Sequence, residues 1–211
     1  MLEEDDFKKK LILASASPRR KKILKLLKLD FEVVEPGGFK EEQFKDPQRT
    51  VLYNSIAKAK NVYGYLTGHK FKKKGSNYKS GFLIAGFDTI IYINRRILGK
   101  PDGREQAIEF LKALSGRVHL AISGACIMDS ASGRYVYDSE TTRVSFRKLT
   151  EDEIERYVDK EDVTDKAGAY NILGIGGLLV DKIDGCFFNI AGIPVAGFVG
   201  LLKKSGLNVI V

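Results

Sequence analysis

Two serines and two arginines surround the start of the first expected helix, and together they suit a bound phosphate. Arg19 and Arg20 follow Pro18, which suits the first position of a helix, while Ser15 and Ser17 come just before it. Free backbone N–H groups at a helix start attract anions, and arginine binds phosphate oxygens through two parallel hydrogen bonds. The segment therefore predicts a phosphate site, with a merely solvated basic face as the alternative.

Asp88 interrupts an apolar run, residues 82–93 (FLIAGFDTIIYI), that is typical of a buried strand. A buried ionised carboxylate needs a partner, and a metal ion or a lysine would supply one. The alternative is an ordinary aspartate that bonds to the backbone at a strand end. A hairpin turn at Asn94-Arg95 would bring Lys100 back near this strand, where it could share an anionic ligand with Asp88.

The elements that must position these side chains alternate between strands and helices. Strands are expected at 11–14, 82–93, 96–98, 118–128, 135–146 and 178–183, and helices at 18–28, 50–65, 102–114, from 150 and from 194. The pattern predicts one α/β domain over residues 1–211. It carries a charged amino-terminal segment at about 1–9 and a basic loop insertion at about 68–81.

Composition excludes several classes of protein. Hydrophobic residues make up 44% of the 211 residues and charged residues 29%, which is the balance of a globular protein. No apolar run approaches the roughly 18 residues that a membrane span needs. The amino terminus shows no secretory signal, so we expect a cytoplasmic protein without a membrane partner.

The formal net charge of +8 raises the hypothesis of a nucleic-acid-binding module, because basic surfaces attract polyanions. Much of the excess is local, however: residues 69–79 (HKFKKKGSNYK) hold five lysines and no acidic residue. We interpret this stretch as a solvated loop. A nucleic-acid partner is therefore the less favoured hypothesis.

Cysteine and histidine are too few for a zinc site. Cys126 and Cys186 have no Cys or His at metal-ligand spacing, and we interpret both as buried apolar residues. The two histidines, His69 and His119, cannot build a zinc site with these partners. Carboxylates remain to hold any metal, which favours magnesium or manganese.

Several blocks of the sequence resemble the Maf, or septum-formation-inhibitor, family of nucleotide pyrophosphatases. The blocks are 13–20 (LASASPRR), 88–89 (DT), 98–101 (LGKP), 165–170 (DKAGAY), 174–177 (GIGG) and 192–194 (GIP). No single tetrapeptide is specific, but together the blocks run in family order from about residue 11 to 202. The resemblance implies a central mixed twisted sheet flanked by helices, as in inosine triphosphate pyrophosphatases, with an active-site cleft between two lobes.

The resemblance also implies roles for particular residues. It assigns phosphate binding to Ser15, Arg20, Lys58 and Lys100. Asp88 would be the catalytic carboxylate, acting as general base or through a metal-bound water. Glu41 is the best match for a second acidic residue, and with Asp88 it would hold a magnesium or manganese ion.

The implied reaction converts a nucleoside triphosphate to its monophosphate and pyrophosphate. Water attacks the α-phosphorus, and lysine, arginine and the metal stabilise the charge on the departing pyrophosphate. The chain contains neither a GxxxxGK[ST] loop nor a GxGxxG motif after a strand, which disfavours ordinary NTPase and dinucleotide-binding classes. The sequence leaves open a homodimer and, as an alternative function, a cell-division regulator on the same fold.

Base preference depends on three positions in the family. Arg19 and Thr89 match the branch that acts on dTTP and UTP, but Leu173 stands where glutamine is usual. An aliphatic side chain cannot make the hydrogen bonds of an amide, so a base contact there would be lost. The branch acting on a methylated guanine nucleotide has tryptophan, glutamine and glutamate at these positions, and none is present. We expect a preference for dTTP and UTP, or action on modified nucleotides.

Overall fold

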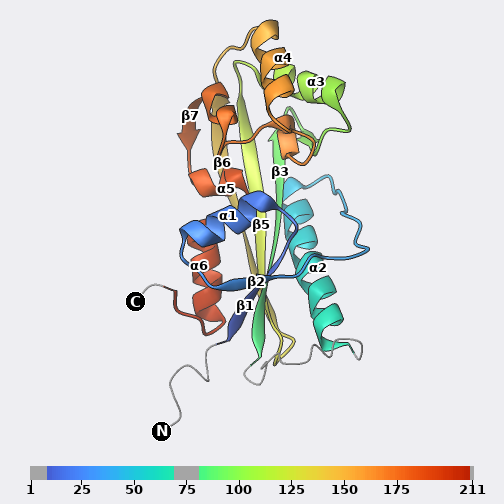
Figure 1. Ribbon diagram of the computed structural model, residues 1–211, viewed down its shortest axis with the longest axis vertical. Coiled ribbons are helices and arrows are strands. Elements are labelled where there is room, and N and C mark those ends of the chain that lie inside the picture. Colours follow the sequence, from blue (N-terminus) through green and yellow to red (C-terminus); the bar gives the residue numbers. More distant parts are fainter. Residues whose placement is uncertain (1–8, 69–80, 210–211) are drawn as a thin grey trace.

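A seven-stranded mixed sheet runs along the molecule in the computed structural model, which describes residues 9–68 and 81–209 (Figure 1). The strands are β1 (Lys10–Ala14), β2 (Phe31–Val33), β3 (Phe82–Ile93), β4 (Arg96–Leu98), β5 (Val118–Asp129), β6 (Tyr135–Phe146) and β7 (Val180–Asp184). Their order is β2-β1-β3-β5-β6-β7, and β4 pairs with β3 beside β1. β1 runs parallel to β2 and β3, whereas β3, β5, β6 and β7 pair antiparallel.

Helices cover both faces of this sheet. They are α1 (Pro18–Leu26), α2 (Pro47–Thr67), α3 (Arg104–Leu114), α4 (Glu151–Lys160), α5 (Phe187–Ala191) and α6 (Val195–Lys204), with 3-10 turns η2 (Ala167–Ala169) and η3 (Ile175–Leu179). Figure 1 shows α3 and α4 at one end of the long strands, and α1, α2 and α6 toward the other. The expected α/β fold with a mixed sheet flanked by helices is confirmed.

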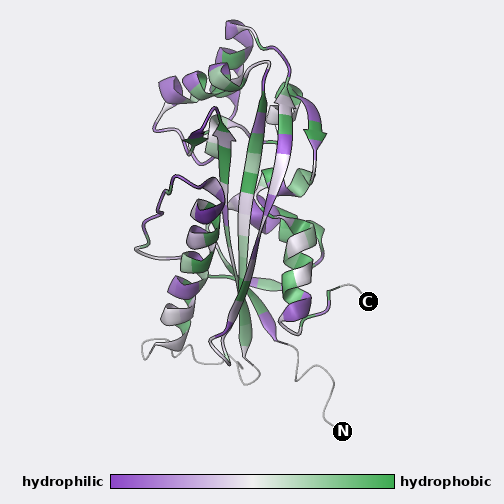
Figure 2. Cartoon of the chain, turned by 180° about the vertical axis from the view of Figure 1, so that it is seen from behind, coloured by the Kyte–Doolittle hydropathy of each residue, from purple (hydrophilic) through white to green (hydrophobic). Residues whose placement is uncertain are grey.

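Apolar packing against the long strands explains this arrangement. Figure 2 shows hydrophobic residues along the sheet and mixed hydrophobic and hydrophilic residues on the helices, as amphipathic helices require. On one face, the ring of Phe87 packs edge-on against Phe198 of α6 with 5.1 Å between centroids. On the other face, Ile84 of β3 packs in one cluster with Ala59 and Val62 of α2.

Two glycines let α2 approach the sheet closely. A Cβ atom on Gly86 of β3 would lie 2.2 Å from the carbonyl oxygen of Ser55, and one on Gly124 of β5 would lie 2.4 Å from that of Val51. Real Cβ atoms are not found so near a backbone oxygen. The glycines therefore set the height of α2 above β3 and β5, and with it the height of every side chain that α2 presents to them.

Gly124→Ala is expected to destabilise the protein by about 1–3 kcal/mol, because the helix must move away from the sheet to admit the methyl group. Gly64→Ala on the same helix is the matched control, since its Cβ would meet no atom within 4 Å. It is expected to stabilise the protein by about 0.5–1 kcal/mol through helix propensity. Urea denaturation measures both changes, and equal effects of the two variants would contradict the proposed role of the close contact.

The local predictions hold for most elements. Asn94 and Arg95 have φ angles of 49° and 61°, as a tight hairpin turn between β3 and β4 requires. Thr150 and Glu153 form the expected capping box at the start of α4. Helix α2 begins earlier than expected, at Pro47, because the side chain of Asp46 caps it by accepting a hydrogen bond from the Gln48 amide.

Other expectations need correction. The last strand begins at Val180 rather than Leu178, because Leu178 and Leu179 belong to a 3-10 turn. Strand β2 and helix α5 were not expected, since three and five residues are too short for a periodic pattern. Cys126 is buried as expected, but Cys186 is only half-buried.

Some expectations concern segments outside the described residues. The charged amino-terminal segment is described only from Lys9, and the lysine-rich part of the basic insertion lies wholly within the gap between residues 68 and 81. Among the helices of the two described ranges, none combines the length and the apolar character needed to span a membrane.

His119 is buried in the aromatic part of the main core. Its Nε2 lies 3.1 Å from the Tyr170 hydroxyl, and its ring packs edge-on against Phe146. Nδ1 is buried and has no hydrogen-bond partner among the described residues. Because burial disfavours the charged imidazolium, the pKa of His119 falls to about 4 from an ordinary value of 6.5.

This burial predicts acid sensitivity. Between pH 6.5 and 4 the unfolded chain binds a proton at His119 that the folded chain does not, so stability falls as the pH falls through this window, by about 3 kcal/mol in all. His119→Gln removes the titration. The difference in unfolding free energy between wild type and variant, measured by urea denaturation, should shrink by that amount from pH 7 to pH 4. A constant difference would contradict the prediction.

Candidate active site

A gap in the sheet creates the site. Strand β1 ends opposite Gly86 of β3, and β4 ends opposite Ile91, so residues 87–90 have no paired strand on that side among the described residues. Ligand crevices in α/β sheets form at the carboxyl ends of strands where the connection changes direction. A pocket of about 540 Å³ opens at this gap, and its volume suits a small-molecule ligand.

All but one of the residues predicted for the site line this pocket. They are Ser15, Arg19, Arg20, Glu41, Lys58, Asp88, Thr89 and Lys100. Leu173 is not among the lining residues, because its side chain is half-buried against the main hydrophobic core. A direct contact between Leu173 and a ligand in this pocket therefore has no support from the geometry.

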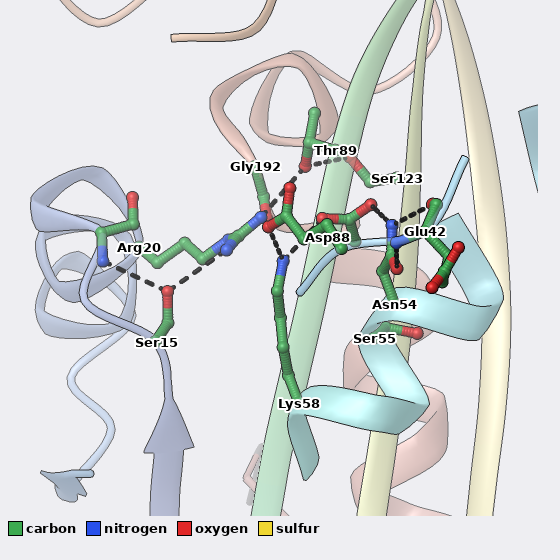
Figure 3. Close-up of polar contacts among 12 residues, drawn as sticks. Ser15, Arg20, Glu42, Asn54, Ser55, Lys58, Asp88, Thr89, Ser123 and Gly192 are labelled. Carbon is green, nitrogen blue, oxygen red and sulfur yellow. Dashed lines mark hydrogen bonds and ion pairs between the residues drawn. The ribbon is translucent and has the colours of Figure 1, made fainter. Parts of the chain in front are cut away.

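Asp88 is held from both sides by residues of α2, as Figure 3 shows. Lys58 Nζ lies 2.6 Å from Asp88 Oδ1, and Asn54 Nδ2 donates to Asp88 Oδ2 over 3.1 Å. The two helix residues are four positions apart and so share one face of α2, directly above the glycines that bring the helix close. The side chains of Lys58 and Asp88 are only 9% and 6% exposed, so this ion pair is largely shielded from solvent.

Glu41 meets the same lysine from the loop before α2. Its Oε1 lies 2.7 Å from Lys58 Nζ, although the Glu41 side chain remains 48% exposed. Burial by itself would raise the pKa of Glu41, but the charge and hydrogen bond of Lys58, and the charges of Lys100 and Arg20, hold that pKa below its ordinary value. One ammonium group thus contacts two carboxylates of the pocket, the buried Asp88 and the half-exposed Glu41.

Arg20 reaches the site from the first turn of α1. Its guanidinium donates to the Gly192 carbonyl over 3.0 Å, to Ser15 Oγ over 3.2 Å and to Thr89 Oγ1 over 3.4 Å. Burial lowers the pKa of Arg20 to about 10, opposed by the charge of Asp88, so the side chain stays cationic at neutral pH. Ser17 occupies the expected N-cap position, but its side chain makes no capping bond.

A hydrogen-bonded row behind Arg20 was not anticipated from the sequence. Thr89 Oγ1 lies 2.8 Å from Ser123 Oγ, and Ser123 Oγ donates to the Asn189 carbonyl over 3.0 Å. The buried Asn189 amide in turn donates to the Ala121 carbonyl and to the Thr142 hydroxyl. The available signal was Ser123 within the expected strand 118–128, because a buried hydroxyl requires a hydrogen-bond partner.

Arg19 and Lys100 complete the positive lining. Burial lowers the pKa of Arg19, and the charge of Asp165 is the largest opposing influence. Asp165 also lines the pocket. Lys100 comes two residues after the end of β4, its charge acts on Glu41, and it lines the same pocket as Asp88, as the expected hairpin requires.

The donor set fits a hard divalent cation. The parts of the chain that the structure describes hold no cluster of three or more His, Cys, Asp or Glu side chains. Glu41 and Asp88 nevertheless face the pocket from either side of Lys58. Magnesium is commonly bound by one or two carboxylates, with phosphate and water oxygens completing its shell, so these residues fit it and the similar manganese ion.

Fold and pocket together define an α/β protein with a cation-lined cleft for a small anionic ligand. The chain belongs to the Maf family: the family model described as "Maf-like protein" matches residues 10–205. The family expected from the sequence is therefore confirmed.

Curated relatives carry the name of one enzyme. A dTTP/UTP pyrophosphatase of Thermoanaerobacter sp. (strain X514) is 40% identical over 195 residues, which cover 92% of this chain and 96% of the relative. Enzymes of the same name from Acetivibrio thermocellus and from Clostridium botulinum (strain Loch Maree) are 37% and 38% identical, over 95% of this chain and 98% and 99% of theirs. These relatives are nucleotide pyrophosphatases, which are hydrolases acting on acid anhydrides.

Proposed function

We propose that this chain hydrolyses nucleoside triphosphates to the monophosphate and pyrophosphate, with dTTP and UTP as preferred substrates. The observation that carries the proposal is that Arg20, Lys58 and Lys100 line the same pocket as Asp88. A triphosphate carries close to four negative charges, and a cluster of fixed cations around one carboxylate is suited to binding and cleaving it.

The cations stabilise charge where the reaction creates it. Water attacks the α-phosphorus, the bond from that phosphorus to the bridging oxygen breaks, and the electron pair leaves with pyrophosphate. Arg20 presents a planar fork that is preoriented by Gly192, Ser15 and Thr89, so it loses little freedom when it binds phosphate oxygens. Lys100 is exposed, and its long flexible side chain would bind the departing pyrophosphate.

Asp88 orients the attacking water and accepts its proton. Lys58 and Asn54 hold the two carboxylate oxygens, so the direction of the carboxylate plane is set before substrate arrives. When bound, a magnesium or manganese ion held by Glu41 and Asp88 would supply Lewis-acid stabilisation of phosphate charge. Lys58 contacts both carboxylates and would hold them near each other, so the ion would not need a third acidic side chain.

Substrate choice is the least constrained part of the proposal. The names of the relatives favour dTTP and UTP, and Arg19 and Thr89 match that branch of the family. Leu173 packs against the core rather than lining the pocket. We therefore expect leucine in place of the usual glutamine to change base preference less than a substitution of a pocket-lining residue would. Modified pyrimidine nucleotides remain within the proposed substrate class.

A substrate panel tests the proposal. Purified protein with magnesium or manganese is incubated with ordinary and modified nucleoside triphosphates, and both pyrophosphate and orthophosphate are measured. We expect pyrophosphate and monophosphate in equal amounts, fastest from dTTP and UTP. Absence of pyrophosphate from every triphosphate would contradict the proposed activity, whereas orthophosphate release would assign a different bond.

The cellular setting belongs to the same proposal. We place the reaction in the cytoplasm, where nucleoside triphosphates are made and used. The homodimer stays a prediction, which sedimentation experiments test. The nucleic-acid alternative depends on the lysine-rich insertion and predicts salt-sensitive binding that disappears when residues 70–79 are deleted.

A further inference from the structure

A loop crosses α2 beside the pocket and is held there by a regular set of contacts. We call residues 36–44 the strap; Pro36, Phe39, Glu41, Glu42 and Gln43 of this segment line the pocket. The strap runs antiparallel to the helix: Gly37 meets Asn61, Glu41 meets Lys58, Glu42 meets Asn54 and Phe44 meets Thr50. Side chains of α2 thus fix where each residue of the strap lies along the helix.

Two of the α2 residues that meet the strap, Lys58 and Asn54, also touch Asp88, and Asn54 does so with the amide that binds the strap backbone. Asn54 Oδ1 accepts from the Glu42 amide over 2.9 Å, while Nδ2 donates to the Glu42 carbonyl over 3.0 Å and to Asp88 Oδ2 over 3.1 Å. Asn54 is only 2% exposed, and its bond to Asp88 is buried, whereas its two bonds to the Glu42 backbone are partly buried. By contrast, the Asn61 amide binds only the Gly37 backbone, in an exposed position.

The chemistry of the site explains why this residue is an asparagine. The position must donate two hydrogen bonds and accept one at the same time, which a primary amide can do. A carboxylate in its place could not donate and would repel Asp88, and a hydroxyl could donate only once. The same amide therefore connects the backbone next to Glu41 with the side chain of Asp88.

We propose that Asn54 is a positioning residue that sets Glu41 and Asp88 relative to each other, by binding the Glu42 backbone and the Asp88 carboxylate with one amide. The proposal rests on the proposed pyrophosphatase function for its kinetic consequence. Lys58 also binds both carboxylates, but through an ammonium group on a flexible four-carbon stem, whereas the planar Asn54 amide binds the strap backbone and Asp88 in fixed directions.

Asn54→Leu tests the proposal, because leucine matches the size of the amide and removes all three bonds. We expect kcat to fall by about 10-fold to 100-fold, as displacement of a reacting group by roughly 1 Å can do. KM should change less than about threefold, because Arg20 and Lys100 are untouched. Asn54→Asp, which keeps the acceptor for the Glu42 amide but cannot donate, is expected to lose at least as much.

Asn61→Leu is the matched control, since it removes two bonds from the strap without touching Asp88. It should keep kcat within twofold of wild type. An equal loss of kcat in the Asn61 and Asn54 variants would overturn the proposal and assign Asn54 to strap anchoring alone. A folded Asn54→Leu protein with wild-type kcat would also overturn it.

A crystal structure of Asn54→Leu separates this proposal from the proposed function. We expect the Asp88 carboxylate to rotate about its side chain and the Glu42 backbone to move away from α2. Unchanged positions of both would overturn the positioning role, whatever the kinetics. If the wild-type protein cleaves no triphosphate, the proposed function fails, and the structure of the variant still decides whether Asn54 positions the two carboxylates.

Discussion

Asp88→Asn is expected to lower the rate of pyrophosphate release by about 100-fold to 10,000-fold, the range that a general base contributes. The substitution removes the negative charge that accepts the proton of water. It also places an amide N–H against either Lys58 Nζ or Asn54 Nδ2, both of which are donors. Initial rates with dTTP and UTP, measured by pyrophosphate release, check the prediction.

Asp138→Asn is the matched control, because the same change is made at an exposed residue of β6 outside the pocket lining. It should leave the rate within twofold of wild type. Circular dichroism and thermal unfolding establish that both variants are folded. An Asp88→Asn protein that is folded and retains more than a tenth of the wild-type rate would exclude Asp88 as the catalytic carboxylate.

The same variant distinguishes catalysis from a regulatory role. If a cell-division effect of this protein persists in Asp88→Asn while hydrolysis is lost, the protein acts through a partner rather than through nucleotide turnover. Loss of both together would assign the effect to the enzyme activity.

Lys58→Met is expected to lower the free energy of unfolding by about 3–5 kcal/mol, as removing one partner of a buried ion pair does. The Nζ atom of Lys58 lies within 2.7 Å of Asp88 and of Glu41, so its loss leaves two carboxylates facing each other. Methionine keeps most of the side-chain volume, which limits the effect of packing. Hydrolysis should fall as well, because a cation of the pocket is gone.

A second substitution tests the electrostatic cause. Adding Asp88→Asn to Lys58→Met removes the uncompensated buried charge, so the double variant should recover part of the lost stability in urea denaturation. Additive destabilisation would contradict the explanation and indicate that Lys58 acts through packing of its alkyl chain. The ionised Glu41 is half exposed and can turn to solvent in either variant.

Much of the site could be predicted because its residue types stand in recognisable local contexts. Asp88 is a charge within an apolar strand, and Arg20 follows a proline at a helix start. Lys100 comes two residues after β4, whose tight turn back from β3 is set by Asn94 and Arg95. In each case the signal lies within a dozen residues of the chain, where periodicity and turn chemistry are readable.

The missed residues depend on contacts between distant segments. Asn54 looks like an ordinary polar position in a helix until α2 is set against β3 and its amide reaches Asp88. Ser123 and Asn189 support Thr89 only because α5 packs across β5 and β6. Hydrogen bonds between residues far apart in the chain leave no periodic signal in one sequence.

By itself the sequence determined the family, the order of most helices and strands, and the cations and carboxylates available for phosphate chemistry. Only the tertiary structure decided which of them meet. The carboxyl ends of β1 and β4 leave a gap beside β3, and Gly86 and Gly124 bring α2 near enough for Lys58 and Asn54 to reach Asp88. The same packing turned Leu173 toward the core. Strand register and helix height, which arise from the summed packing of the whole chain, determine the direction of each side chain.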